Sequence, residues 1–227
     1  MNRFVWNTRY PDATDFDGMI MWAGSTGGPR AVPGEYQVRL TVGDWSDTRT
    51  FRLVPDPRVE VTQADLEEQF DFLIRIRDRV SEANQAVVRI RDVEKQLEGV
   101  MERAKGHSDA DTINAVSKDL MERLSEVEAE IYQVKNRSSQ DPLNYPIRLN
   151  NKIAGLTGVV SSADAKPTDQ SYAVYEELSA RLQVQLDLLE AIVANEIPAF
   201  NDFVRERDIP AVLLRDDDEK PVGMGRP

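Results

Sequence analysis

The chain of 227 residues contains no cysteine and a single histidine, His107. Without cysteine it can form no disulfide, offers no thiolate ligand to a metal and has no cysteine nucleophile. A zinc site would have to be built almost wholly from carboxylates, and a histidine-based nucleophile relay would have one position to use. The composition therefore disfavours zinc-dependent and nucleophilic catalysis.

Positive charge and long apolar runs are also scarce. The 28 Lys and Arg residues are outnumbered by 40 Asp and Glu residues, which gives a net charge of -12. Such a chain repels a phosphate backbone on average, so nucleic acid is not an expected partner. No run of about 18 consecutive apolar residues occurs, so we expect no direct membrane span. With 41% hydrophobic and 30% charged residues, the composition is that of an ordinary globular protein.

The N-terminal region has the period of two that is typical of strands with one buried face. Apolar and polar residues alternate over residues 36–42 and again over residues 48–54, and the intervening residues 43–47 are rich in Gly and Asp. This pattern predicts a β-hairpin. Residues 3–8 and 19–23 are two further candidate strands. Four or five short strands without helices predict a small immunoglobulin-like β-sandwich.

After residue 57 the period changes to that of a helix. From Thr62 onward, apolar residues recur every seven positions, at Leu66, Leu73, Val80 and Val87. Thr62 and Asp65 resemble a capping box, and the pattern runs to about residue 104, before Gly106. These signals predict one long helix, which needs a partner helix beside it.

Three more helical segments follow. The second helix starts near residues 108–111 and predicts an antiparallel hairpin with the first. A shorter helix is expected over residues 147–161. The last helix opens at residues 167–168 and ends near residue 207, with a break or kink at Pro198. Up-down helices with one interrupted connector predict a four-helix bundle.

The sequence thus predicts an α+β protein in which an N-terminal immunoglobulin-like β-sandwich is followed by an elongated antiparallel four-helix bundle. The expected domains are the sandwich at residues 1–57, the bundle with its long helical hairpin at residues 58–207, and a mobile acidic tail at residues 208–227.

Two motifs invite a chemical interpretation, and their context argues against both. The Gly-rich residues 24–28 suggest a phosphate loop, but Pro29 follows where a helix would have to begin. Asp15 and Asp17 match inner positions of a calcium loop, whereas its first and twelfth positions lack oxygen ligands. We therefore predict no catalytic residue, no metal and no cofactor, and we expect the chain not to be an enzyme.

Exposed apolar and aromatic side chains are the candidates for binding, since interfaces concentrate their energy in a few such residues. The candidate interaction residues are Trp22, Trp45, Ile209, Val212, Leu213 and Leu214. The hypothesis is a structural or accessory module that docks on another protein or a larger complex, which could be membrane-associated. An alternative is carbohydrate binding, if Tyr10, Trp22 and Trp45 form one exposed aromatic platform.

Three strings carry a resemblance to a known family. They are Asn-Arg-Phe-Val-Trp at residues 2–6, Ala-Val-Pro-Gly-Glu-Tyr-Gln-Val-Arg-Leu at residues 31–40, and Leu-Asn-Tyr-Pro-Ile-Arg-Leu-Asn-Asn-Lys at residues 143–152. With them, nearly the whole chain resembles the C-terminal region of bacterial sortilin-like proteins with an Asp-box β-propeller, which are often labelled glycosyl hydrolase or sialidase-like. In that family a small sandwich and a helical region follow the propeller.

The resemblance implies a location outside the cytoplasm, in the periplasm, although the first residues carry no secretory signal pattern. It does not imply a catalytic residue here, because the sequence has no Asp-box repeat and any hydrolase activity would reside in the propeller. A detached C-terminal part of a sialidase-like or glycosyl hydrolase-like protein and an independent subunit both stay open. A glycoside hydrolase-related enzyme also stays an alternative, and the oligomeric state is open.

Overall fold

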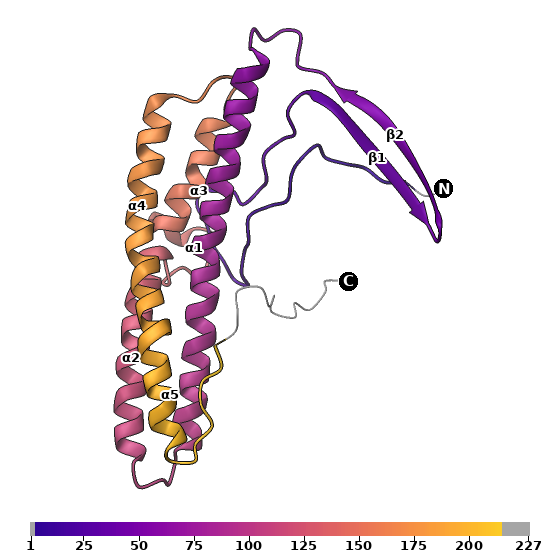
Figure 1. The fold of residues 1–227 in the computed structure, drawn as a ribbon. Coiled ribbons are helices and arrows are strands. Elements are labelled where there is room, and N and C mark those ends of the chain that lie inside the picture. Colours follow the sequence, from indigo (N-terminus) through magenta and orange to yellow (C-terminus); the bar gives the residue numbers. More distant parts are fainter. Residues whose placement is uncertain (1–2, 215–227) are drawn as a thin grey trace. The chain divides into compact units, whose positions relative to one another are not determined.

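The structure, a computed structural model, describes residues 3–214 and has a mixed α+β fold. A two-stranded antiparallel sheet precedes the helices (Figure 1). The elements in chain order are β1 (Gly34–Val42), β2 (Trp45–Leu53), α1 (Gln63–Arg103), α2 (Ala110–Ile131), the 3-10 turn η1 (Asp141–Leu143), α3 (Leu149–Val160), α4 (Asp169–Ala191), the π-helical turn η2 (Ile192–Glu196) and α5 (Ile197–Arg205).

The predicted hairpin is confirmed, with a shorter loop than expected. Val42 pairs with Trp45, so the turn is only Gly43 and Asp44, and the register continues to Gly34 opposite Leu53. Gly43 has φ +58°, a conformation that glycine adopts without a steric penalty. The immunoglobulin-like sandwich is not confirmed, because β1 and β2 form the only multi-residue sheet within residues 3–214.

The two further strands expected at residues 3–8 and 19–23 are not present. Residues 8–31, which we call the strap, instead double back on themselves. Tyr10 N–H donates to the Pro29 carbonyl at 3.0 Å, and Ala13 N–H donates to the Thr26 carbonyl at 2.7 Å. A β-bridge joins Arg9 and Arg30. The strap therefore uses isolated backbone bonds where a sandwich would need continuous ladders.

The helix boundaries follow the sequence signals closely. Thr62 and Asp65 form the predicted capping box, in which Asp65 N–H donates to Thr62 Oγ1 at 3.1 Å and Thr62 N–H donates to Asp65 Oδ2 at 3.2 Å. The Thr62 hydroxyl and, after it, the Thr62 N–H both donate to Asp65 Oδ2 and hold the pKa of the Asp65 carboxyl below its usual value. Gly106, with φ +85°, lies in the turn after α1. Pro198 stands at the start of α5, where the last helix was expected to break.

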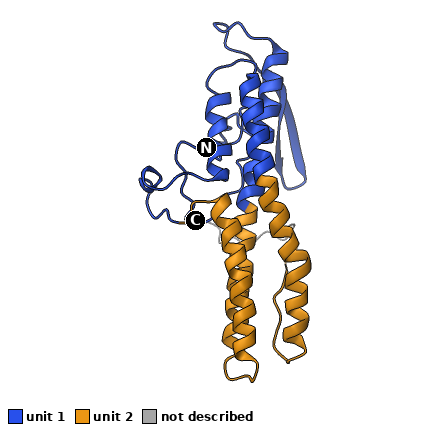
Figure 2. Cartoon of the chain, turned by 90° about the vertical axis from the view of Figure 1, so that its left-hand side faces the viewer, with its two compact units in different colours: residues 1–84, 135–181 blue, residues 85–134, 182–227 orange. Residues whose placement is uncertain are grey.

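The chain divides into two compact units, coloured separately in Figure 2. Unit 1 comprises Met1–Asn84 and Lys135–Arg181, and unit 2 comprises Gln85–Val134 and Leu182–Pro227. The domain boundaries expected at residues 57 and 207 stay a prediction from the sequence. The four-helix bundle is not confirmed, and each unit has its own helical arrangement. Residues 215–227 of the expected acidic tail lie outside the described residues.

Unit 1 holds the hairpin, the strap and three helical segments. Tyr172 of α4 donates a hydrogen bond to Glu68 Oε1 of α1, and Tyr175 of α4 donates to the Arg75 carbonyl of α1. Because residue numbers increase in the same direction along both helices, α4 runs parallel to α1. Gln69 of α1 bonds to the Val160 carbonyl at the end of α3. The core between these segments includes Phe72, Ile76, Val80 and Ile153, each at most 1% exposed.

Unit 2 contains α2 beside the second part of α1. Arg91 pairs with Glu128, and Ser125 Oγ donates to Glu94 Oε1 at 2.6 Å. From the first contact to the second, the residue number rises along α1 and falls along α2. The two helices are therefore antiparallel, as the sequence predicted for this helical hairpin. The pKa of Glu94 is raised, chiefly because the carboxylate loses solvent on burial.

Candidate functional site

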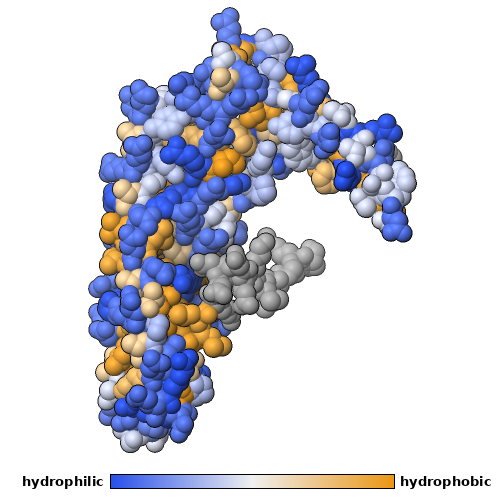
Figure 3. All heavy atoms as spheres, in the orientation of Figure 1, coloured by the Kyte–Doolittle hydropathy of each residue, from blue (hydrophilic) through white to orange (hydrophobic). Residues whose placement is uncertain are grey.

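The hairpin of unit 1 leaves most of one apolar face exposed. Since side chains alternate along a strand, the β1 residues with even numbers share a face with the β2 residues with odd numbers. We define the hairpin face as Tyr36, Val38, Leu40, Val42, Trp45 and Phe51. Leu40 is 61% exposed, Val42 64% and Trp45 56%. In Figure 3 the hairpin carries apolar side chains among polar ones.

The Trp6 side chain covers the end of the hairpin face that lies farthest from the turn. The Trp6 ring lies 5.6 Å from that of Tyr36 and 6.1 Å from that of Phe51, between centroids. Tyr36 donates a hydrogen bond to the Val32 carbonyl at 2.7 Å. Burial, followed by the charge of Tyr10, raises the pKa of Tyr36. The uncovered part is therefore the turn end of the hairpin.

The two strands differ in how they protect the hairpin face. β2 places Asp47 and Arg49 among the apolar side chains, where they form an ion pair at 2.9 Å. β1 has no charged side chain on this face. Charges set among the apolar side chains of an edge strand discourage that face from continuing into a sheet with another chain. The β1 edge therefore lacks a protection that β2 has.

Both outer edges of the hairpin are open. Because the turn has two residues, Val42 and Trp45 form a hydrogen-bonded pair, and such pairs recur at every second residue. The N–H and C=O groups of Glu35, Gln37, Arg39 and Thr41 consequently point outward from β1. Within residues 3–214 no backbone hydrogen bond from another segment reaches them.

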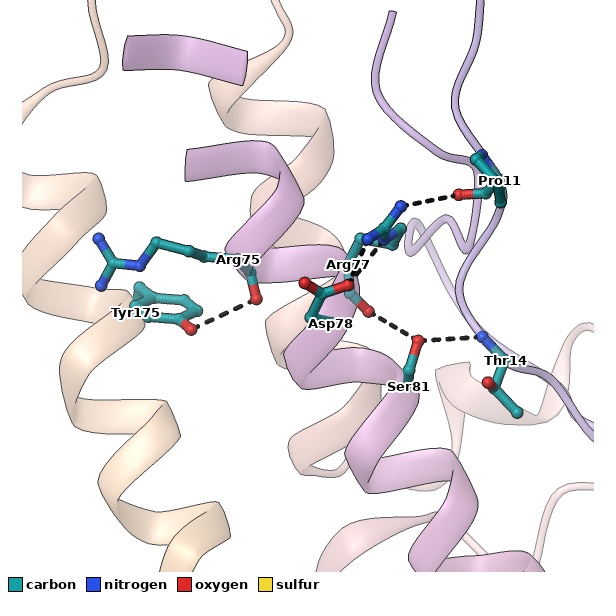
Figure 4. Close-up of polar contacts among 7 residues, drawn as sticks. All are labelled: Pro11, Thr14, Arg75, Arg77, Asp78, Ser81 and Tyr175. Atoms are coloured by element: carbon teal, nitrogen blue, oxygen red, sulfur yellow. Dashed lines mark hydrogen bonds and ion pairs between the residues drawn. The ribbon is translucent and has the colours of Figure 1, made fainter. Parts of the chain in front are cut away.

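The strap is fixed to α1 by a row of polar side chains (Figure 4). Arg77 Nη1 donates to the Pro11 carbonyl at 3.4 Å, and Thr14 N–H donates to Ser81 Oγ at 3.1 Å. One turn further, Asn84 Nδ2 donates to the Thr14 carbonyl at 2.7 Å. Arg77, Ser81 and Asn84 lie three and four residues apart, on one side of the helix.

The strap is fixed to α3 by one side-chain amide. Trp22 N–H donates to Asn151 Oδ1 at 2.7 Å, and Asn151 Nδ2 donates to the Trp22 carbonyl at 2.8 Å. Asn150 Nδ2 joins this network by donating to Asn84 Oδ1 at 3.0 Å. Asn151 thus satisfies the backbone groups of Trp22, and Asn150 Oδ1 accepts a hydrogen bond from Asn151 N–H at 2.7 Å. We call such a two-bond contact between an amide side chain and one backbone residue an amide clamp.

A cavity of about 430 Å³ lies between the strap, the base of the hairpin, α1 and α3. Its lining includes Arg9, Arg30, Gln69, Phe70 and Asp164. Gln69 is used internally, since its Nε2 donates to the Val160 and Ala163 carbonyls at 2.7 Å each. Basic and acidic side chains both line the cavity, so its charge selects no single class of ligand.

The aromatic residues considered for carbohydrate binding have different surroundings. Tyr10 packs edge to face on Phe70, with ring centroids 4.8 Å apart. Trp22 is 40% exposed and its backbone is held by Asn151. Trp45 stands beside the hairpin turn. No ring contact joins these three residues within the described part of the chain.

The candidate residues at 209–214 divide into two kinds. Ile209 and Val212 are 6% and 2% exposed, and both are part of the core of unit 2. Leu213 and Leu214 are 72% and 39% exposed. The backbone of Val212 and Leu213 is fixed, because amide clamps from Asn201 and Gln96 hold these two residues respectively.

Among the described residues, no group of three or more His, Asp or Glu side chains is placed to hold a metal ion. His107 lies in the turn before α2, where its Nδ1 accepts a hydrogen bond from Asp109 N–H at 3.1 Å. No helix within residues 3–214 combines the length and apolar character needed to cross a bilayer.

Comparison with protein-family models, with curated proteins and with solved structures found no match. The resemblance to the C-terminal region of sortilin-like proteins therefore stays a prediction from the sequence. The same holds for the location outside the cytoplasm that it implies.

Proposed function

We propose that this chain is a non-catalytic accessory module that docks on a larger protein assembly through the hairpin face of unit 1. The observation that carries the proposal is the exposure of Leu40, Val42 and Trp45, side by side on one face of a two-stranded sheet. A two-stranded hairpin alone is marginally stable in water, and a further apolar layer would stabilise it. A contiguous apolar patch of this kind is typical of an interaction site.

The structural setting supports this role. The strap is bonded to α1 and α3, and Trp6 packs on the hairpin, so the hairpin face is presented by a segment with its own fixed contacts. Trp45 has the residue type that most often contributes binding energy at interfaces, and it stands next to Val42 at the turn. Together they offer an aromatic anchor within an aliphatic surface.

The proposal is tested by affinity purification of the tagged protein from its native host, with mass spectrometry of the proteins that co-elute. The test variant is Leu40→Ser/Trp45→Ser. The matched control is Val184→Ser/Leu188→Ser, which removes two α4 side chains of similar exposure, 55% and 49%. We expect one stoichiometric partner with the wild type and the control, and its loss with the hairpin variant.

Two results would contradict the proposal. If the same partner co-eluted in equal amount with the hairpin variant, the docking surface would lie elsewhere on the chain. If the protein bound glycans on an array and Trp45→Ser abolished the signal, carbohydrate binding would replace protein docking as the function of this face.

A further inference from the structure

We infer that the outer edge of β1 pairs with the β1 edge of a second copy of the chain, which joins two hairpins into one four-stranded antiparallel sheet. This inference concerns the edge of the hairpin, whereas the proposed docking uses its face. The two can therefore succeed or fail separately.

The first argument is the unprotected state of this edge. β1 is nine residues long, contains no proline, and has outward N–H and C=O groups without a backbone partner from another segment among the described residues. On the hairpin face β1 contributes no charged side chain, since its residues there are Tyr36, Val38, Leu40 and Val42. β2 has Asp47 and Arg49 in the corresponding row. Pairing is therefore expected on β1 rather than on β2.

The second argument is charge complementarity, which favours a second copy as the occupant. On the polar face of β1, Glu35 and Arg39 stand on either side of Gln37. Within residues 3–214 neither side chain forms an ion pair: Glu35 stands opposite Arg52 of β2 without one, and Arg39 Nε donates to the neutral Thr48 Oγ1 at 3.1 Å. If two β1 strands pair antiparallel about a two-fold axis at Gln37, each Glu35 lies directly opposite the Arg39 of the other copy. One strand thus supplies both halves of two cross-strand ion pairs.

The same register suits the other face and the backbone. Tyr36 of one copy lies opposite Val38 of the other, so the two hairpin faces become one continuous apolar surface. Gln37 and its symmetry mate both point their N–H and C=O groups toward the partner, as a hydrogen-bonded pair requires. The hairpin itself, residues 34–54, has three acidic and three basic residues, so two copies can approach here despite the net charge of -12.

The test uses sedimentation equilibrium of the full chain over a concentration series. We expect a monomer–dimer equilibrium for the wild type. Glu35→Arg or Arg39→Glu alone places like charges opposite each other twice and should weaken the dimer by about tenfold. The double variant Glu35→Arg/Arg39→Glu exchanges the two charges and should restore the wild-type dissociation constant.

Cysteine substitution tests the register in a chain that has no cysteine of its own. Directly opposite residues of a hydrogen-bonded pair have Cα atoms about 5.5 Å apart, within the range that a disulfide spans. Gln37→Cys should therefore form a covalent dimer under mild oxidation. Thr50→Cys, at an exposed position on the outer edge of β2, is the matched control and should stay monomeric.

The outcomes separate the alternatives. A monomer at all concentrations, or equal cross-linking of Gln37→Cys and Thr50→Cys, would overturn the inference while leaving the docking of the hairpin face to its own capture experiment. A dimer that is insensitive to both single charge reversals would also overturn it, because the contact would then lie outside this edge.

Discussion

Two extended apolar segments, the hairpin that contains the candidate residue Trp45 and the segment of residues 209–214, differ in how far the rest of the chain covers them. Val212 is 2% exposed, whereas Leu40 on β1 is 61% exposed. The backbone differs in the same way. Asn201 and Gln96 clamp Val212 and Leu213, whereas no other segment bonds to the outward backbone groups of β1 within the described residues.

The difference shows what makes an apolar segment available to a partner. An extended apolar segment is stabilised when its side chains are buried and when its backbone N–H and C=O groups are hydrogen-bonded. In residues 209–214 the chain itself bonds to the backbone of Val212 and Leu213 and covers the side chains of Ile209 and Val212, whereas Leu213 and Leu214 are exposed. On the hairpin, β2 supplies partners for the inward backbone groups of β1, but within residues 3–214 no other segment bonds to the outward groups. Only the end of the apolar face beside Trp6 is covered.

The largest effect is expected from a charge placed in the covered segment. Val212→Asp would bury a carboxylate without a partner in unit 2 and should destabilise the protein by about 3 kcal/mol. Val42→Asp, at a position that is 64% exposed, is the matched substitution on the hairpin and should have a far smaller effect. Urea denaturation of both variants gives the comparison. Equal losses of stability would show that the two segments are covered alike.

A smaller effect is expected from removing the clamp that holds the covered segment. Asn201→Ala leaves the N–H and C=O groups of Val212 buried without partners, which should cost about 2 kcal/mol. The control is Asn195→Ala, because the Asn195 amide is exposed and donates to the Ala191 carbonyl one turn earlier in the same helical segment. If both variants unfolded at the same urea concentration, the clamp would contribute nothing measurable.

The amide clamp on the strap should contribute somewhat less. Asn151→Ala removes both bonds to Trp22, but this contact is only partly buried and water can replace it in part. We expect a loss of about 1 kcal/mol. Faster hydrogen exchange at the Trp22 amide, measured by NMR, would show the local release of the strap. Unchanged exchange at Trp22 would mean that other contacts hold the strap alone.

The parts of the fold that could be predicted from the sequence are those whose contacts lie between neighbouring residues. Helix ends depend on residues close together in the chain, such as Thr62 with Asp65, Gly106, and Pro198, and their expected positions agree with the structure to within a few residues. The hairpin likewise depends on local alternation and on the turn at Gly43. Signals of this kind can be recognised in one sequence because their partners are neighbours.

The strap could not be predicted in the same way. Residues 19–23 have the composition of a strand, but Trp22 bonds to an amide side chain 129 residues away instead of to another strand. No local pattern announces that Asn151 replaces a strand as the hydrogen-bonding partner. For the same reason the sequence identified Val212 as apolar and could not show that Asn201 and the core of unit 2 already cover it.

The smallest change in stability is expected where the proposed function is most sensitive. Leu40→Ser removes an exposed aliphatic side chain from the hairpin face, so the free energy of unfolding should change by no more than about 0.5 kcal/mol. The same substitution should reduce capture of the protein partner, because Leu40 lies between Val38 and Val42 in the apolar row of β1. Urea denaturation and quantitative capture, carried out on one preparation, measure both quantities. A large loss of stability would show that Leu40 is already packed within the chain, and the hairpin would then resemble residues 209–214 instead of contrasting with them.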